Sequence, residues 1–252
     1  MSKSMISAPP QGTTEPDLTP EIRAIVAHAD DNLILAQRLG ELISNTAELE
    51  IDIAVANIAL DHLGVARALY THAGKLEGKG RDEDHLAMGR TERQFINLLL
   101  VEQPNGDFAH TVVRQMLFDA YQLQLWEDLS RSTDTVLAGI AAKALKEAAY
   151  HFRFSSGWVV RLGDGTDESH LHAQDALDAL WPFTTEMFDG GAAGYRPAWE
   201  RMVIEVIDEA TLVKPTDPYQ RTGGRQGFHS EHLGFVIAEM QWMHRTYPGM
   251  EW

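Results

Sequence analysis

Apolar residues recur at helical spacing through most of this chain, and no segment shows the sustained polar–apolar alternation that is typical of a strand. The periodic segments are long, several of them about 20 to 28 residues, which favours a helical bundle over an assembly of short helices. We therefore predict an all-α fold built around a bundle.

Local signals set the expected limits of the helices. Thr19, Pro20 and Glu21 combine a capping hydroxyl, a proline at the first helical position and an acid near the positive end of the helix dipole. The Pro-Asn-Gly turn at 104–106 ends the third segment. The second segment is apolar nearly all round, which is typical of a helix in the middle of a bundle. The expected helices cover about 20–42, 84–102, 108–130, 135–162, 168–188, 196–212 and 230–247, and a further one that begins after the acids at 48, 50 and 52 and runs to about 73.

Composition narrows the class of protein further. A chain of 252 residues with 44% hydrophobic residues can bury a large core, so we expect residues 20–252 to form a single domain. The proline-rich residues 1–19 lack the apolar stretch of a signal peptide and are expected to be a disordered tail. No apolar run approaches the ~20 residues of a membrane span. The absence of cysteine excludes disulfides and thiolate chemistry and suits a cytoplasmic protein.

The net charge of the chain limits the kinds of partner that it can bind. The formal net charge is −16, whereas nucleic acids and anionic membrane surfaces attract proteins with a positive field. Neither is therefore expected as the main partner.

Four acidic residues repeat one spacing in two pairs of helical segments. Asp31 and Asp61 are 30 residues apart, and Asp119 and Glu147 are 28 residues apart. In a four-helix di-iron bundle, two helices each give a carboxylate and the other two each give a Glu-x-x-His motif. Three residues after Asp61 and Glu147, however, the sequence has glycine and tyrosine instead of histidine. The pattern predicts a ferritin-like four-helix bundle, with additional C-terminal helices, whose metal site is degenerate at Asp31, Asp61, Gly64, Asp119, Glu147 and Tyr150.

The four acids share their helix faces with apolar residues, so each is expected to be buried. A buried carboxylate costs several kcal/mol unless a metal, a shared proton or a nearby base compensates its charge. Candidate bases lie on the same helical segments. They are His28, Arg38, His62, Arg67, Lys143, Lys146 and His151. We expect a polar network in the core, with no metal bound by this chain.

A glycine-rich basic loop precedes the last helical segment, with Arg221, Gly223, Gly224 and Arg225. Backbone amides, two arginines and a helix start can hold a phosphate group. The alternatives are a solvated connection and a docking loop for another subunit.

Several stretches resemble one known family. They are 37–41 (QRLGE), 48–52 (ELEID), 93–106 (RQFINLLLVEQPNG), 146–155 (KEAAYHFRFS) and 221–224 (RTGG). With these motifs the chain resembles the C-subunit family of the bacterial ring 1,2-phenylacetyl-CoA epoxidases, and the likeness covers nearly everything after residue 20.

The resemblance implies a place in a multicomponent monooxygenase that uses O2 and NADPH-derived electrons to epoxidise the ring of phenylacetyl-CoA. In that family the A subunit carries the di-iron centre, the C subunit pairs with A and supports it, and a small B subunit bridges the pairs. The chain is therefore expected to be a non-catalytic structural subunit, with no catalytic residue and no cofactor of its own.

Two other functions stay open on the sequence. One is an independent di-iron oxidase or iron-storage protein that uses the four acids. The other is a module of the complex that binds the CoA moiety through the basic loop. The sequence leaves open whether the chain contacts the substrate or associates with itself.

Overall fold

The computed structural model describes residues 18–46, 48–216 and 219–248, and these contain helices, turns and extended connections but no strand. The all-α prediction is confirmed. The expected disordered tail, 1–19, lies outside the described residues except for its last two positions. The α-helices in the described ranges are α1 Pro20–Gly40, α2 Leu49–Glu77, α3 Glu83–Met88, α4 Phe108–Leu129, α5 Thr135–Gly163, α6 Asp167–Leu180, α7 Arg196–Glu209, α8 Glu231–Met240 and α9 Trp242–Thr246. Short 3-10 helices occur at η1 Glu92–Gln94, η2 Trp181–Phe183, η3 Thr185–Phe188, η4 Gly190–Tyr195 and η5 Gly224–Gln226.

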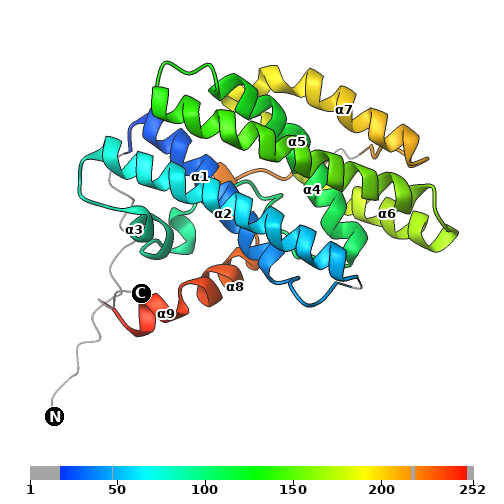
Figure 1. Cartoon of the computed structure of the whole chain (residues 1–252), viewed down its shortest axis with the longest axis horizontal. Coiled ribbons are helices and arrows are strands. Elements are labelled where there is room, and N and C mark those ends of the chain that lie inside the picture. Colours follow the sequence, from blue (N-terminus) through cyan, green and yellow to red (C-terminus); the bar gives the residue numbers. More distant parts are fainter. Residues whose placement is uncertain (1–17, 47, 217–218, 249–252) are drawn as a thin grey trace, which may run out of the picture.

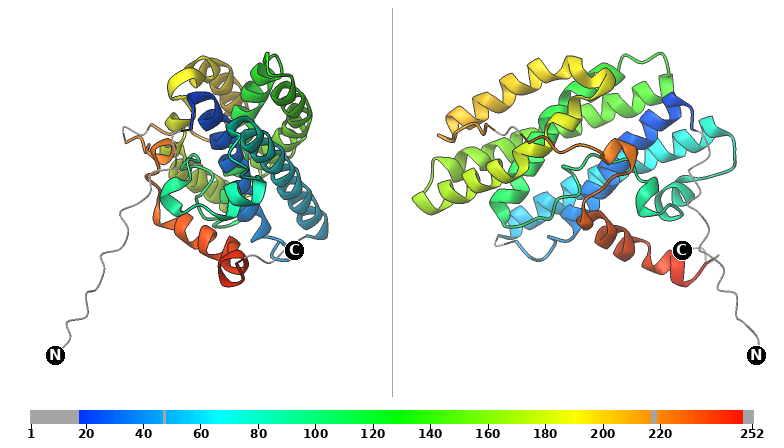
Figure 2. Two further views of the ribbon diagram at one scale, coloured as in Figure 1. Left: turned by 90° about the vertical axis from the view of Figure 1, so that its left-hand side faces the viewer. Right: turned by 180° about the vertical axis from the view of Figure 1, so that it is seen from behind.

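Four long helices form a bundle at the centre of the molecule (Figure 1). α1 packs along α2, α4 packs along α5, and α2 also contacts α5, which joins the two pairs. α6 and α7 pack against α4 and α5, and α8 lies against α1 at the lower side of the bundle (Figure 2). A continuous apolar core runs through both pairs. The arrangement is the predicted four-helix bundle with additional C-terminal helices.

The ends of the long helices follow from local sequence signals. The Thr19 hydroxyl accepts a hydrogen bond from the N–H of Ile22, as expected for the residue before Pro20. The carboxylates of Asp107 and Asp134 cap α4 and α5 in the same way. α2 continues past its expected end near residue 73 and stops before Gly78, whose φ of 68° is favoured by glycine.

The helix predicted over 84–102 is wrong in its second half. α3 ends at Met88, and most of the remaining segment runs as turns and extended chain. Backbone N–H groups of this segment donate to buried carboxylates of other elements instead of to carbonyls within a helix. The pairs are Ile96 with Asp30, Leu98 with Asp31, and Leu99 with Glu186, at 2.8, 2.7 and 2.9 Å. Tertiary contacts therefore override the helical periodicity here.

The prediction that the second helix lies in the middle of the bundle is also wrong. α2 buries one face against α1 and α5. Its opposite stripe is apolar but faces solvent, with Leu49, Ile53, Leu60 and Leu63 between 41% and 69% exposed. At 100° per residue these four positions fall within about 80° of one another on the helix. α2 is thus an outer helix with two apolar faces, one of which has no partner among the described residues.

The C-terminal helices are shorter than predicted. The helix expected over 168–188 ends at Leu180, because the ring of Pro182 cannot continue an α-helical hydrogen-bond pattern. The helix expected over 230–247 is divided at Gln241, whose side-chain amide donates to the carbonyls of Ala87 and Arg90. No helix in the described ranges is long and apolar enough to cross a membrane.

Candidate functional site

The structure does not bring the six predicted metal-site positions together. They are Asp31, Asp61, Gly64, Asp119, Glu147 and Tyr150. Asp31 and Asp119 are buried, but the side chain of Asp61 is 38% exposed and that of Glu147 is 17% exposed. Tyr150 is 44% exposed, and Gly64 also lies on the surface.

Two of the four acids are paired with basic side chains. Asp31 pairs with Arg225, whose Nη2 donates to its Oδ2 at 2.6 Å. The partially exposed Glu147 lies 3.1 Å from the Nζ of Lys143, one turn away on α5. Arg225 therefore compensates the buried Asp31 within the core, whereas Glu147 is paired with the exposed Lys143 at the surface of α5.

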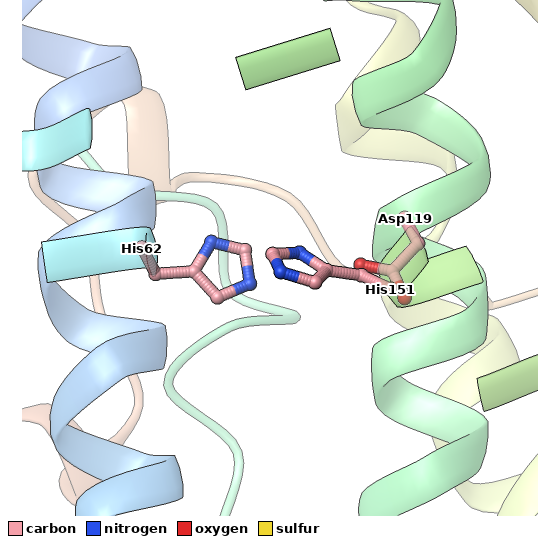
Figure 3. Close-up of side chains that lie close together, drawn as sticks. All are labelled: His62, Asp119 and His151. Carbon is pink, nitrogen blue, oxygen red and sulfur yellow. The ribbon is translucent and has the colours of Figure 1, made fainter. Parts of the chain in front are cut away.

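The interior of the bundle is formed by the residues next to the predicted positions. On α2 the buried stripe includes Ile58, His62 and Val65, and on α5 it includes Ala148 and His151. The imidazoles of His62 and His151 point toward each other across the bundle, with Asp119 of α4 beside them (Figure 3). The centroids of the two rings are 5.0 Å apart. One ligand atom from each of the three residues lies within 4.8 Å of the other two.

The sequence indicated both histidines as candidate bases, but the spacing of the acids placed other residues on the inward faces of their helices. The signal was the apolar stripe of each helix: Val55, Ile58, Val65 and Leu69 share a face with His62. Following that stripe, and not the spacing of the acids, gives the correct inward face.

Hydrogen bonds fix the tautomer of His62. The amide nitrogen of Asn32 donates to the carbonyl of His28, so the amide oxygen of Asn32 faces the ring. Nδ1–H of His62 then donates to this oxygen at 2.8 Å, and Nε2 carries the lone pair. Nε2 lies 3.1 Å from the amide nitrogen of Gln115. Burial, followed by the charge of His151, lowers the pKa of His62 well below its ordinary value, so the ring is neutral.

His151 is held in a similar way from the opposite side. Its Nε2–H donates to the carboxylate of Asp61 at 3.1 Å, while its Nδ1 is buried and has no hydrogen-bond partner in the described part of the chain. Burial lowers the pKa of His151, and the hydrogen bond and charge of Asp61 offset this only in part. Both rings therefore carry an unprotonated nitrogen within the polar interior.

Among the described residues, Asp119 is the only carboxylate that lies close to both rings. It is fully buried, accepts from Gln115 Nε2 at 2.6 Å and accepts from the Ser155 hydroxyl at 2.8 Å. Burial raises the pKa of Asp119 well above its ordinary value, against the opposing effect of these two hydrogen bonds. Within the described ranges, no cationic side chain compensates its charge in the way that Arg225 compensates Asp31.

This set of residues does not fit a di-iron centre. The ligands of a di-iron bundle comprise four carboxylates and two histidines. Here two histidines converge with one carboxylate, and the nearby Asp61 is a partially exposed hydrogen-bond partner of His151.

Residues 4–252 match the family described as "Phenylacetic acid catabolic protein". The chain belongs to this family. A relative, the C subunit of 1,2-phenylacetyl-CoA epoxidase from Escherichia coli strain K12, is 50% identical over 237 residues, which cover 88% of this chain and 95% of the relative. The resemblance carried by the sequence motifs is thereby confirmed, and the helical bundle is the ferritin-like fold of the family.

In this family member, the basic loop directs one of its two arginines inward. Arg225 is enclosed by Asp31 and by the carbonyls of Ala27 and Ile96, to which its Nη1 also donates. Gly223 and Gly224 are buried, and the N–H of Gly223 donates to Glu186. Arg221 is exposed and lies over the ring of Phe183. A phosphate or CoA contact at this loop stays a prediction, and of the two arginines Arg221 is the exposed one, whereas the Arg225 side chain is 19% exposed.

A second feature of the surface is the set of exposed apolar side chains on the adjacent helices α2 and α5. Val136 and Tyr150 of α5 are 53% and 44% exposed. A surface groove of about 400 Å³ runs between the two helices, lined by Gly64, Ala68, Val136 and Ile140 among others. We refer to the exposed apolar side chains of these two adjacent helices together as the α2–α5 face: Leu49, Ile53, Leu60, Leu63, Val136 and Tyr150.

Proposed function

We propose that this chain is a structural subunit of a 1,2-phenylacetyl-CoA epoxidase, which pairs with the di-iron A subunit and does not hold the active site of the complex. The supporting observation is the α2–α5 face. Exposed apolar side chains in such numbers mark a surface that binds another protein. The similarity to the C subunit of the Escherichia coli enzyme supports membership of the complex, and the poor fit of the interior to a di-iron centre supports a non-catalytic role.

The mechanical contribution of the chain follows from its construction. Its loops are tied to the bundle by buried polar contacts, among them Asp31 with Arg225 and Glu186 with the N–H of Gly223. A rigid partner holds the helices of a catalytic subunit at their working positions, and chemistry that depends on placement within ~0.5 Å benefits from such support. We expect an obligate interface larger than ~2,000 Å².

The remaining parts of the proposal follow the family resemblance. The di-iron centre belongs to the A subunit, and a small B subunit bridges the pairs. This chain contacts phenylacetyl-CoA at most indirectly and works in the cytoplasm. An independent di-iron protein is disfavoured because one carboxylate cannot supply the four that the centre needs. A CoA-binding module is disfavoured because Arg225 is already paired with Asp31.

The test is a pair of charge substitutions on the α2–α5 face, Leu60→Glu and Leu63→Glu. Both side chains are exposed, so the isolated chain should keep its helical content and melting temperature. The variants should fail to co-elute with the catalytic subunit in size-exclusion chromatography, and the reconstituted complex should lose epoxidation of phenylacetyl-CoA.

Leu171→Glu is the matched control, because Leu171 is a similarly exposed leucine of α6, outside the α2–α5 face. It should assemble and support turnover like the unmodified chain. Normal assembly and turnover with Leu60→Glu and Leu63→Glu would contradict the proposal. Iron-dependent oxidase activity of the chain alone would favour the independent enzyme, and CoA binding that is lost in Arg221→Ala would favour the binding module.

A further inference from the structure

The polar interior between α2, α4 and α5 has more hydrogen-bond acceptors than donors. His62 Nε2 and His151 Nδ1 present lone pairs, and Asp119 adds a carboxylate. Among the described residues, the only side-chain donors to these groups are the Gln115 amide and the Ser155 hydroxyl, and the buried His151 Nδ1 and Gln115 Oε1 have no partner. Buried acceptors without a donor are costly, so the cluster favours a positively charged occupant.

Both histidines are oriented as metal ligands are. A histidine that binds a metal donates its other ring N–H to a carbonyl or a carboxylate, which fixes the ring and its tautomer. His62 donates to the amide oxygen of Asn32, and His151 donates to the carboxylate of Asp61. Gln122 also donates to the same oxygen of Asn32, at 3.0 Å, and holds that side chain in place.

From this geometry we propose that His62, His151 and Asp119 bind a single divalent transition-metal ion inside the bundle. Two imidazoles and one carboxylate suit zinc, iron(II) and cobalt(II), which bind nitrogen and oxygen ligands at about 2.0–2.2 Å. Ligand atoms on opposite sides of such an ion are at most ~4.4 Å apart, so atoms within 4.8 Å need only a small inward rotation of the side chains. Gln115 adds a further oxygen if its amide turns over, since its Oε1 has no partner within the described ranges.

The proposed site differs from both sequence-based expectations about metal, the bound di-iron centre and the absence of any metal. It holds one ion where no metal was expected, and it uses His62 and His151 in place of three of the four acids whose spacing suggested a di-iron centre. It goes beyond the proposed structural function without altering it, because an ion with protein ligands on three helices can stabilise a bundle. An ion here would join α2, α4 and α5.

The experiment titrates the metal-free full-length chain with Co²⁺ and follows the visible ligand-field absorption and the melting temperature. We expect saturation near one ion per chain, a cobalt absorption band and a rise in melting temperature, since a ligand that binds only the folded state stabilises it. Zn²⁺ added afterwards should displace the cobalt and remove the band.

Two variants and one matched control make the result specific. His151→Gln and Asp119→Asn should each weaken cobalt binding by more than ~10-fold. Asp119→Asn nearly preserves the shape of the side chain, so it remains informative even if His151→Gln folds poorly. His72→Gln is the control, because His72 is also a buried histidine of α2 that is bonded to a carboxylate, that of Asp134, outside the cluster. It should bind cobalt like the unmodified chain.

Other outcomes would overturn the proposal. They are the absence of saturable binding, binding that is unchanged in both His151→Gln and Asp119→Asn, and a crystal structure grown with Co²⁺ in which a water molecule alone bridges His62 and Asp119. Because the readouts are binding and stability of this chain, they are independent of assembly with the catalytic subunit. Failure here and failure of the proposed function are therefore distinguishable.

Discussion

The guanidinium of Arg225 donates to both carboxylate oxygens of Asp31, at 2.9 Å from Nη1 and 2.6 Å from Nη2. The two residues are 194 positions apart, and the ion pair ties the loop before α8 to the middle of α1. Burial acts to raise the pKa of Asp31, but the charge of Arg225 and the hydrogen bonds outweigh it and keep the pKa below its ordinary value. Asp31, which the acid spacing had placed in a metal site, thus anchors the loop before α8.

Replacing Arg225 by methionine should destabilise the chain strongly. Asp31 would remain as a buried carboxylate without its cation, and breaking a buried pair in this way costs ~3–5 kcal/mol. Chemical denaturation measures the change in the free energy of unfolding. Arg221→Met in the same loop is the control and should change it by less than ~0.5 kcal/mol, because Arg221 is exposed. Equal effects of the two variants would show that Asp31 does not depend on Arg225.

Gly224→Ala should also destabilise the chain, by ~1–3 kcal/mol. An added Cβ would lie 2.2 Å from the carbonyl oxygen of Asn97 and 3.1 Å from the N–H of Leu99, so the loop could not dock as closely. Gly139→Ala in α5 is the counterpart, because nothing lies within 4 Å of its added Cβ. Alanine favours a helix over glycine, so that variant should gain ~0.5–1 kcal/mol. Thermal denaturation tests the prediction, because the melting temperature should fall in Gly224→Ala and rise in Gly139→Ala.

The buried pair of His229 and Glu102 should make stability depend on pH. Nδ1–H of His229 donates to Glu102 and Nε2–H donates to the carbonyl of Phe95, both at 2.8 Å, so the ring is an imidazolium. Burial acts to lower the pKa of His229, but the hydrogen bond to Glu102 and its charge outweigh burial and raise the pKa above 6.5.

The raised pKa of His229 sets the direction in which stability changes with pH. The stabilisation by His229 is fully present below its ordinary pKa of 6.5 and is lost as the pH rises through the raised value in the folded chain. The free energy of unfolding, measured from about pH 5 to pH 9, should show this fall, and His229→Gln should remove it. His85→Gln on the exposed surface should keep it. A His229→Gln profile that still shows the full fall would contradict the assignment.

Asp119→Asn should raise the stability of the metal-free chain at neutral pH. Because burial raises the pKa of Asp119, the folded state holds its proton more tightly than the unfolded state does. The stability of the unmodified chain therefore falls as the pH rises above the ordinary pKa of 3.8. An amide removes this penalty, and a gain of ~1 kcal/mol corresponds to roughly 2–4 °C in melting temperature for a chain of this size. A lower melting temperature for the variant at neutral pH would refute the burial effect.

Much of the helical framework could be predicted from the sequence because helix ends depend on neighbouring residues. Thr19, Asp107 and Asp134 each cap a helix within three residues of their own position. The segment 84–102 could not be predicted in this way, since the carboxylates that bind its backbone come from α1 and from residue 186.

For the candidate site, the sequence supplied the right helices but the wrong register. His62 directly follows Asp61, an acid that the spacing favoured, and a shift of one residue turns a helical side chain by about 100°. His151 lies one helical turn after Glu147, at a net rotation of about 40°. Only the packing of α2 against α1 and α5 decides which of Asp61 and His62 faces inward.

The sequence by itself determined the all-α class, the long helices, the family and the absence of cysteine chemistry, because these depend on composition, local capping and motif identity. The tertiary structure alone decided that Asp31 meets Arg225, that His62 and His151 face each other, and that the apolar stripe of α2 faces solvent. These relationships join residues that are distant in the chain, and a helical pattern fixes the spacing of side chains along one helix but not its rotation against its neighbours.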